Sequence, residues 1–179
     1  ALPGIDRIFL HCPGCNDTFG PEDVDADILQ ETRLFHFGYP PLMRRMYRSG
    51  GEELEQVLER AHAAGAVTSL DMALPDPDSA AGGADWRAIL SRALPHTDVF
   101  LPSLEELMFM LRRGRFEELA EKPGGICENF APEDLQSLAG ECLQMGSQIV
   151  VIKCGHVGAY LRTDGRPEGM GQCLGRAED

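Results

Sequence analysis

The sequence predicts an α/β protein built on a twisted, mainly parallel sheet flanked by helices. Short apolar segments of four or five residues recur along the chain, and Pro, Gly or Asp closes most of them. The longer segments between them carry apolar residues at the spacing of a half-buried helix. Strands and helices that alternate in this way predict a parallel sheet with helices on both faces.

Six segments fit a strand. In chain order the expected strands are residues 7–11, 34–37, 66–70, 98–101, 148–152 and 159–161. We expect the last two to be antiparallel neighbours. His36 lies inside an apolar strand, which is typical of a core histidine with its hydrogen bonds satisfied.

The clearest helix covers residues 52–64, where Leu54, Val57, Leu58 and Ala61 form one apolar face. Further helical stripes begin near Trp86, Leu104 and Leu135, and Trp86 is expected to pack in the core. The segments 112–131 and 163–179 show only weak patterns. Residues 163–179 end in Gly and charged residues without completing a helix or strand, so we expect an incomplete domain.

Composition narrows the function classes. Hydrophobic residues make up 43% of the chain and charged residues 25%, with a formal net charge of −13. Such an acidic surface repels phosphate backbones, so we expect no nucleic-acid partner. No apolar run is long enough to cross a membrane, so we expect no membrane partner.

The chain opens without a secretory signal, so its cysteines indicate reduced thiols and a cytoplasmic protein. Cys142 and Cys154 fit small core residues.

Ligands of open α/β sheets bind beyond the carboxyl ends of the strands. The residues expected at that edge are therefore candidates for the site. They are residues 12–19, Gly38, Tyr39, Asp71, residues 103–106 and residues 153–158.

Three of these segments resemble a known family. Residues 102–106 (PSLEE) are similar to the Pro-Asn-x-x-Glu segment of ribokinase (PfkB) family sugar kinases. Residues 152–160 (IKCGHVGAY) resemble that family's nucleotide loop, and residues 13–17 (PGCND) resemble its Gly-Ala-Asn segment near the sugar. Their order and spacing agree with the family along nearly the whole chain.

The resemblance implies a ribokinase-like fold and transfer of the ATP γ-phosphoryl group to a sugar hydroxyl, with ATP and Mg²⁺ bound. Glu106 would organise the Mg²⁺. Asn16, Tyr39 and Asp71 would face the sugar or its lid. The nucleotide would contact Ser103, Lys153, Cys154, Gly155, His156 and Gly158. Family members often pair through the lid, which leaves a homodimer open.

The sequence also departs from the family. Ser103 stands where the family has Asn, and Cys15 replaces a small Ala. The family's Gly-Ala-Gly-Asp segment, which supplies the base and an anion hole, does not occur in the printed sequence. The N-terminal sugar-binding segment with its paired glycines is also absent. We therefore expect residues 1–179 to form one partial ribokinase-like domain, with no catalytic residue in this stretch and no catalysis by it alone.

Simpler interpretations stand beside each motif. Ser103 and Glu106 fit a capping box before an apolar helix, and residues 155–158 fit a plain tight turn. Lys153 fits a solvated strand-end lysine, and Asp71 fits a residue that bonds the backbone of the following turn. Tyr39 and the two prolines after it fit a turn that leads into a helix.

Two other function classes remain open. One is a non-catalytic nucleotide- or sugar-binding module. The other is a thiol redox protein that uses Cys12 and Cys15, because a C-x-x-C after a strand is typical of such sites.

Overall fold

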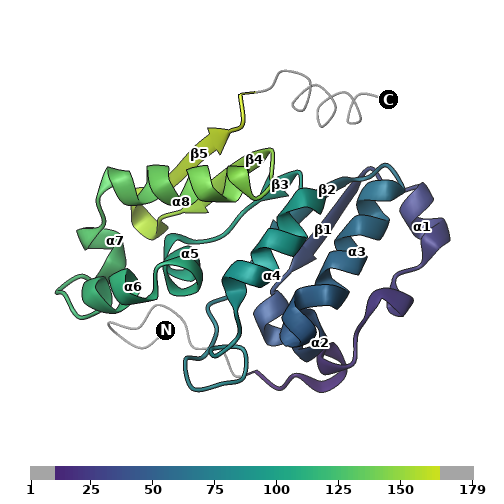
Figure 1. The fold of residues 1–179 in the computed structure, drawn as a ribbon, viewed down its shortest axis with the longest axis horizontal. Coiled ribbons are helices and arrows are strands. Elements are labelled where there is room, and N and C mark those ends of the chain that lie inside the picture. The colour runs from purple at the N-terminus through teal and green to yellow at the C-terminus, as the bar shows by residue number, and fades with distance from the viewer. Residues whose placement is uncertain (1–10, 166–179) are drawn as a thin grey trace.

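The protein is a layer of helices packed on a five-stranded sheet (Figure 1). This computed structural model describes residues 11–165. The strands lie side by side in sequence order, and the first four are parallel while β5 is antiparallel to β4. They are β1 (Leu34–Gly38), β2 (Val67–Asp71), β3 (Val99–Phe100), β4 (Ile149–Lys153) and β5 (Ala159–Thr163).

These strands confirm the predicted sheet and its antiparallel last pair. β3 is shorter than the predicted segment 98–101. At its start, the Asp98 backbone N–H donates to the Thr68 side chain and not to a neighbouring strand. After its end, Pro102 has no N–H with which to extend the ladder. The predicted strand 7–11 lies almost wholly outside the described residues, as does Cys173.

Four helices lie where the apolar stripes predicted them. They are α3 (Glu52–Ala63), α4 (Trp86–Ala93), α5 (Leu104–Leu111) and α8 (Pro132–Gln144). The sequence pattern did not reveal the other helices, which are α1 (Ala26–Gln30), α2 (Arg44–Tyr47), α6 (Arg113–Ala120) and α7 (Gly125–Asn129). Within residues 11–165 no helix combines the length and apolar character that a membrane crossing requires.

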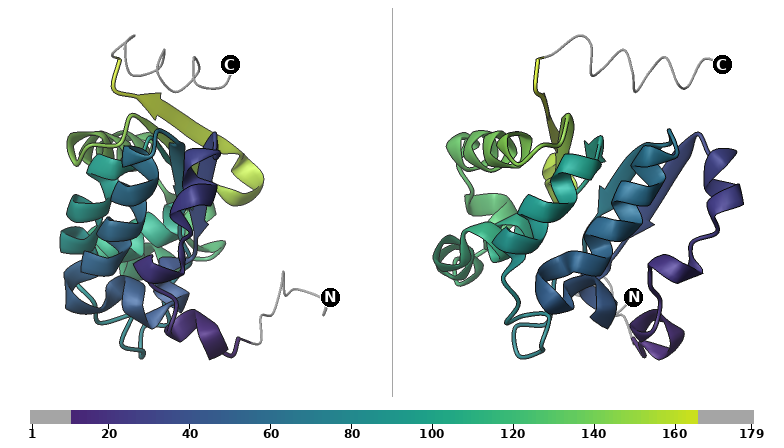
Figure 2. Two further views of the ribbon diagram at one scale, coloured as in Figure 1. Left: turned by 90° about the vertical axis from the view of Figure 1, so that its right-hand side faces the viewer. Right: turned by 45° about the vertical axis from the view of Figure 1, so that its right-hand side comes forward.

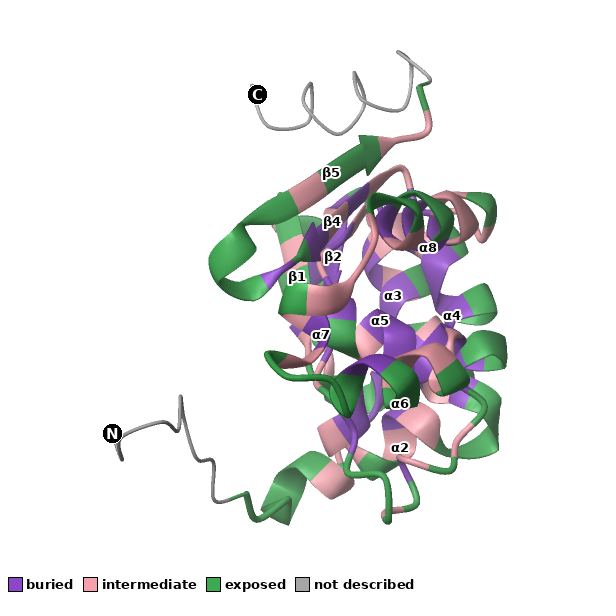
Figure 3. Cartoon of the chain, turned by 90° about the vertical axis from the view of Figure 1, so that its left-hand side faces the viewer, coloured by how far each residue is buried: buried purple, intermediate pink, exposed green. Residues whose placement is uncertain are grey.

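The core lies between this helical layer and one face of the sheet (Figures 2 and 3). Leu70, Phe100, Val150 and Ile152 point into it from neighbouring strands and are fully buried. Trp86 is a core residue as predicted, since it is 2% exposed and its Nε1 donates to the Ala81 carbonyl at 2.7 Å. Burial of this apolar face is the main stabilising contribution to the fold.

The opposite face of the sheet is much less covered by the described residues. Leu34 on β1 is 59% exposed and Leu161 on β5 is 62% exposed, while Val151 between them is half-buried. The expectation of helices on both faces is therefore met on one face only in residues 11–165. His36 lies on this exposed side, where its Nδ1 is 3.0 Å from Ser69 Oγ. The prediction of a core histidine is wrong, because the alternation of the strand turns His36 away from the helices.

A buried polar anchor fixes the amino-terminal edge of the sheet. Asp98 is 3% exposed and accepts hydrogen bonds from the Thr68 N–H at 2.8 Å and from Gln148 Nε2 at 2.8 Å. Its backbone N–H in turn donates to Thr68 Oγ1. These bonds hold β2, β3 and the start of β4 in register, so the opposite, carboxyl edge is placed with little freedom.

Candidate functional site at the carboxyl edge of the sheet

Four polar residues meet beyond the ends of β2, β3 and β4, and we call them the strand-end cluster: Asp71, Ser103, Glu106 and Lys153. Lys153 Nζ donates to Asp71 Oδ1 at 2.6 Å, although β3 lies between their strands. The Lys153 N–H donates to the Pro102 carbonyl at 2.9 Å, and Ser103 forms an isolated parallel bridge with Lys153. Parallel strands end at one edge, so residues 82 positions apart become an ion pair.

Ser103 and Glu106 form the predicted capping box at the start of α5. The Glu106 N–H donates to Ser103 Oγ at 3.2 Å, and the Ser103 N–H donates to Glu106 Oε2 at 2.6 Å. These bonds satisfy two of the free N–H groups at this helix end. They leave the Glu106 carboxylate near enough to Lys153 and Asp71 for their charges to interact, so capping does not remove it from the cluster.

The electrostatics of the cluster centre on Glu106. Burial raises the pKa of this carboxyl group above its usual value, and the negative charge of Asp71 adds to the rise. The Ser103 N–H and the Lys153 ammonium act in the opposite direction but do not cancel it. The fold therefore keeps a carboxylate where its charge is costly, which is frequent in functional sites but also occurs in structural ion-pair networks.

Asp71 makes the turn contact that the sequence suggested, and it also belongs to the strand-end cluster. Its Oδ1 accepts a hydrogen bond from the Met72 N–H at 2.8 Å, as expected for a turn residue. The same oxygen accepts from Lys153, and its side chain is only 16% exposed. A side chain held from two directions is pre-set to present its second oxygen at the edge of the sheet.

The β4–β5 connection is a closed loop. The Cys154 N–H donates to the Gly158 carbonyl at 2.8 Å, and residues Gly155–Val157 form one 3₁₀ turn inside it. Gly155 has φ +57° and Gly158 has φ +111°, values that favour glycine. Cys154 is buried, which confirms its core placement, and burial raises the pKa of its thiol. His156 is exposed at the tip of the loop.

Tyr39 reaches the same edge from β1. Its N–H donates to the Asp71 carbonyl at 3.2 Å, and its backbone is left-handed with φ 66° and ψ 47°. That conformation is uncommon for a non-glycine residue. The side chain is 52% exposed. Pro40–Leu42 follows as a 3₁₀ turn, so the helix-entry interpretation holds and leaves the ring free to contact a ligand.

Asn16 is not joined to the cluster within the described residues. It is exposed on a 3₁₀ turn, Gly14–Asp17, that is attached to α2 through Asp17 Oδ1 and the Arg44 N–H at 3.1 Å. No hydrogen bond or ion pair inside residues 11–165 links it to the four cluster residues.

Cys12 and Cys15 are exposed in the same segment, and the 3₁₀ turn there is too short to act as the long helix of a thioredoxin-like site.

Sequence reasoning missed one neighbour of the loop. Cys127 on α7 lies so close to Gly155 that a Cβ at this glycine would be 3.4 Å from the Cys127 Sγ. Burial raises the pKa of the Cys127 thiol. Residues 112–131 carry no clear periodicity, so only the folded chain shows that α7 lies beside the loop.

The cluster suits Mg²⁺ as a partial ligand set. Residues 11–165 contain no group of three or more His, Cys, Asp and Glu side chains that would enclose a metal ion. Mg²⁺ is usually held by one or two carboxylates, with phosphate oxygens and waters completing its shell. Glu106 and Asp71 are near enough for their charges to interact, and they fit that mode.

Comparisons with known proteins agree on the architecture. No family model matches the chain. A fructokinase with bound ATP from Xylella fastidiosa superimposes with a TM-score of 0.58 at 18% identity, over 84% of this chain and 40% of that protein. An Arabidopsis thaliana ribokinase complexed with ribose and ATP gives a TM-score of 0.52 at 17% identity, over 80% and 36% of the two chains. The chain has the ribokinase-like fold.

Two further matches define the limits of this likeness. A pyridoxal kinase from Staphylococcus aureus in complex with AMP-PCP has a TM-score of 0.53 at 18% identity, over 78% of this chain and 46% of that one. An uncharacterized sugar kinase from Archaeoglobus fulgidus is 24% identical over 161 residues, which are 90% of this chain and 52% of that protein. The ribokinase-like chain thus spans between 36% and 52% of the length of these four matches.

Proposed function

We propose that the chain is the nucleotide-binding part of a cytoplasmic, ATP-dependent sugar kinase that transfers the γ-phosphoryl group to a sugar hydroxyl. The observation that carries this proposal is the strand-end cluster, in which Lys153 is paired with Asp71 at 2.6 Å beside the Glu106 carboxylate. The ATP in the matching fructokinase and ribokinase supports the choice of nucleotide, and the sugar kinase from Archaeoglobus supports the choice of acceptor.

Each residue has a specific role in this proposal. Lys153 leaves Asp71 and places its ammonium group on the ATP phosphates, where it offsets the charge that develops during transfer. Glu106 holds waters or Mg²⁺ near the same phosphates. When bound, Mg²⁺ neutralises phosphate charge and orients the transferred group. Gly155 and Gly158 let the loop backbone approach the nucleotide.

The acceptor side is proposed for Tyr39, Asp71 and Asn16. Tyr39 and Asp71 lie at adjacent strand ends, so they can contact one ligand together. We assign no general base among these residues, and the proton of the acceptor hydroxyl must leave through a group outside this set. Phosphoryl transfer depends chiefly on positioning and charge stabilisation, which the strand-end cluster supplies only in part.

The chain offers a sharp test because it contains two lysines, Lys122 and Lys153. We expect ATP to protect Lys153 from limited acetylation, read by peptide mass spectrometry, and to leave Lys122 unprotected. Lys122 is the matched control, since it is also half-exposed and also paired with an acid, Glu118, at 2.8 Å. Equal modification of both lysines at saturating ATP would remove Lys153 from the nucleotide site.

Substitutions test the same exchange of partners by calorimetry. Lys153→Ala is expected to weaken ATP binding by about tenfold, the usual magnitude for one charge-assisted hydrogen bond. Asp71→Asn is expected to strengthen it, because Lys153 no longer has to leave a carboxylate. Lys122→Ala should change nothing. A weaker affinity in Asp71→Asn would instead mean that Asp71 contacts the nucleotide or its metal.

A further inference from the structure

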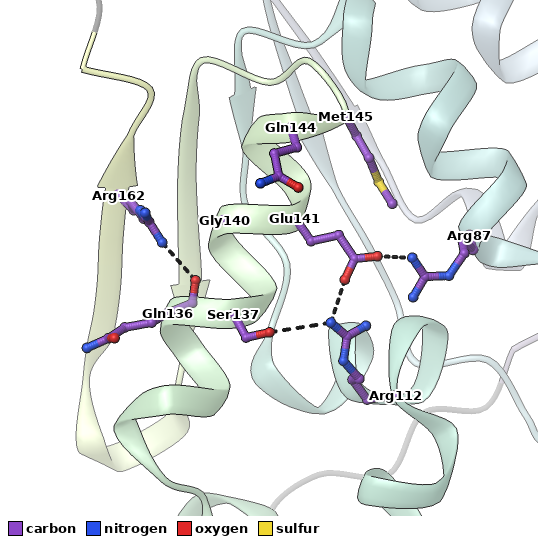
Figure 4. Close-up of a pocket in the computed structure, with 9 residues that line it drawn as sticks. All are labelled: Arg87, Arg112, Gln136, Ser137, Gly140, Glu141, Gln144, Met145 and Arg162. Atoms are coloured by element: carbon purple, nitrogen blue, oxygen red, sulfur yellow. Dashed lines mark hydrogen bonds and ion pairs between the residues drawn. The ribbon is translucent and has the colours of Figure 1, made fainter.

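A polar hollow lies on the outer surface of the helical layer, apart from the strand-end cluster (Figure 4). It has a volume of about 680 Å³ and crosses the middle of α8. None of the strand-end cluster residues lines it, and none of its nine lining residues is aromatic. Three of them are arginines, in a chain whose formal net charge is −13.

Two of the arginines lie together at one end. Glu141 on α8 accepts from Arg87 on α4 and, at 2.6 Å, from Arg112, which follows α5. The Leu111 carbonyl holds both guanidinium groups in place, with Arg87 Nη2 at 3.2 Å and Arg112 Nη1 at 2.9 Å. One carboxylate between two guanidinium groups leaves a charge of +1.

Exposure differs among these three side chains. Glu141 is 16% exposed, whereas Arg87 is 51% exposed and Arg112 is 36% exposed. The acid therefore lies beneath the arginines and orients them, while their remaining N–H groups face solvent at the rim. Arg112 Nη2 also lies 3.4 Å from Ser137 Oγ, which adds a hydroxyl to the same rim.

The third arginine lies at the other end, across the helix. Arg162 on β5 is exposed and donates from Nη1 to the Gln136 carbonyl at 2.8 Å. Gly140 permits this approach, because a Cβ at that position would be 3.0 Å from the same Nη1. Figure 4 shows Gly140 between Arg162 on one side of α8 and Arg112 on the other.

We propose that this hollow binds an extended small molecule with a phosphate at each end, the class of a sugar bisphosphate. Guanidinium groups match phosphate oxygens in geometry and charge. The two positive ends are separated by the width of a helix, about 10 Å, which a single phosphate cannot span. The small and polar surface at Ser137 and Gly140 accommodates a hydroxylated carbon chain between them. This site is separate from the nucleotide site and does not depend on it.

The test is a calorimetric titration with fructose 1,6-bisphosphate and, in parallel, with inorganic phosphate, at low salt and without Mg²⁺. We expect the bisphosphate to bind at least about tenfold more tightly, and Arg162→Ala to remove that advantage. Arg92→Ala is the matched control, because Arg92 is also exposed and is paired with Glu55 outside the hollow. Gln144→Glu, which adds a negative charge to the lining with little change of shape, should weaken bisphosphate binding as well.

Equal affinity for both anions would overturn the proposal, as would bisphosphate binding that Arg162→Ala and Gln144→Glu leave unchanged. Binding lost in Lys153→Ala but retained in Arg162→Ala would place the anion at the strand-end cluster. That result would refute this site and still favour the proposed function. Conversely, failure of ATP to protect Lys153 would leave the bisphosphate site unaffected.

Discussion

Glu106 shows how a single residue couples the stability of this fold to its proposed chemistry. Its carboxyl group caps α5 through the Ser103 N–H, yet burial and Asp71 raise its pKa. The folded protein therefore holds the Glu106 proton more tightly than the unfolded chain does. Its contribution to stability is present below the unfolded pKa and is lost as the pH rises through the folded pKa. A carboxylate kept at such a cost is a good candidate for binding a cation.

Glu106→Gln tests this linkage. The amide oxygen can still accept from the Ser103 N–H, and it carries no charge to bury. We expect the variant to be more stable than the parent protein near neutral pH, with the difference vanishing below about pH 4, where the parent carboxyl is protonated in both states. Denaturant unfolding between pH 3.5 and 8 gives the measurement.

Glu105→Gln is the control for that experiment. The Glu105 side chain is adjacent in sequence but exposed, so its substitution should not change how stability depends on pH. If Glu106→Gln is less stable at neutral pH by the same amount as at low pH, the carboxylate acts as a structural cap and its charge carries no cost.

The α5 helix shows how one element can serve two purposes. Ser103 and Glu106 satisfy its first N–H groups, and the same turn fixes them beside Lys153. The capping box is confirmed, and the proposed role at the phosphates stays a prediction that is compatible with it. A substitution that preserves the cap while changing the polar group separates the two.

Ser103→Ala and Ser103→Asn make that separation. Ser103→Ala should lower the free energy of unfolding by about 1 kcal/mol, the usual effect of losing an N-cap. Ser103→Asn should leave stability nearly unchanged, because Asn caps as well as Ser. If the proposed nucleotide site is right, the Asn variant should also bind ATP more tightly, since its amide adds a donor beside the phosphates. Unfolding and calorimetry together decide this, and a stable Asn variant that binds ATP less well would contradict the proposed contact.

The whole molecule has one sheet face that the described residues leave largely open. Leu34 and Leu161 stand on it with more than half of their surface exposed, on strands at opposite edges of the sheet. Large apolar side chains exposed on one face of a sheet are candidates for an interaction face or an aggregation hazard.

Leu34→Thr combined with Leu161→Thr should reduce both the binding of an apolar fluorescent dye and self-association by the isolated chain. Thr suits strands, so stability should change by no more than about 1 kcal/mol. Ile28→Thr is the matched control, because Ile28 is 65% exposed on α1, away from the sheet. Unchanged dye binding in the double variant would mean that this face is covered in solution.

The sequence alone determined the order and type of the main elements, because period and turn residues act locally. The apolar stripe of α3 and the residues that close β2 and β4 are examples. Because ligands of such sheets bind beyond the carboxyl ends of the strands, the sequence then pointed to Asp71 and Lys153. Tertiary structure decided what faces what. The Lys153–Asp71 contact, the approach of Cys127 on α7 to Gly155 and the exposure of His36 depend on how distant segments pack. Packing is a property of pairs of elements, and no local pattern in either one records it.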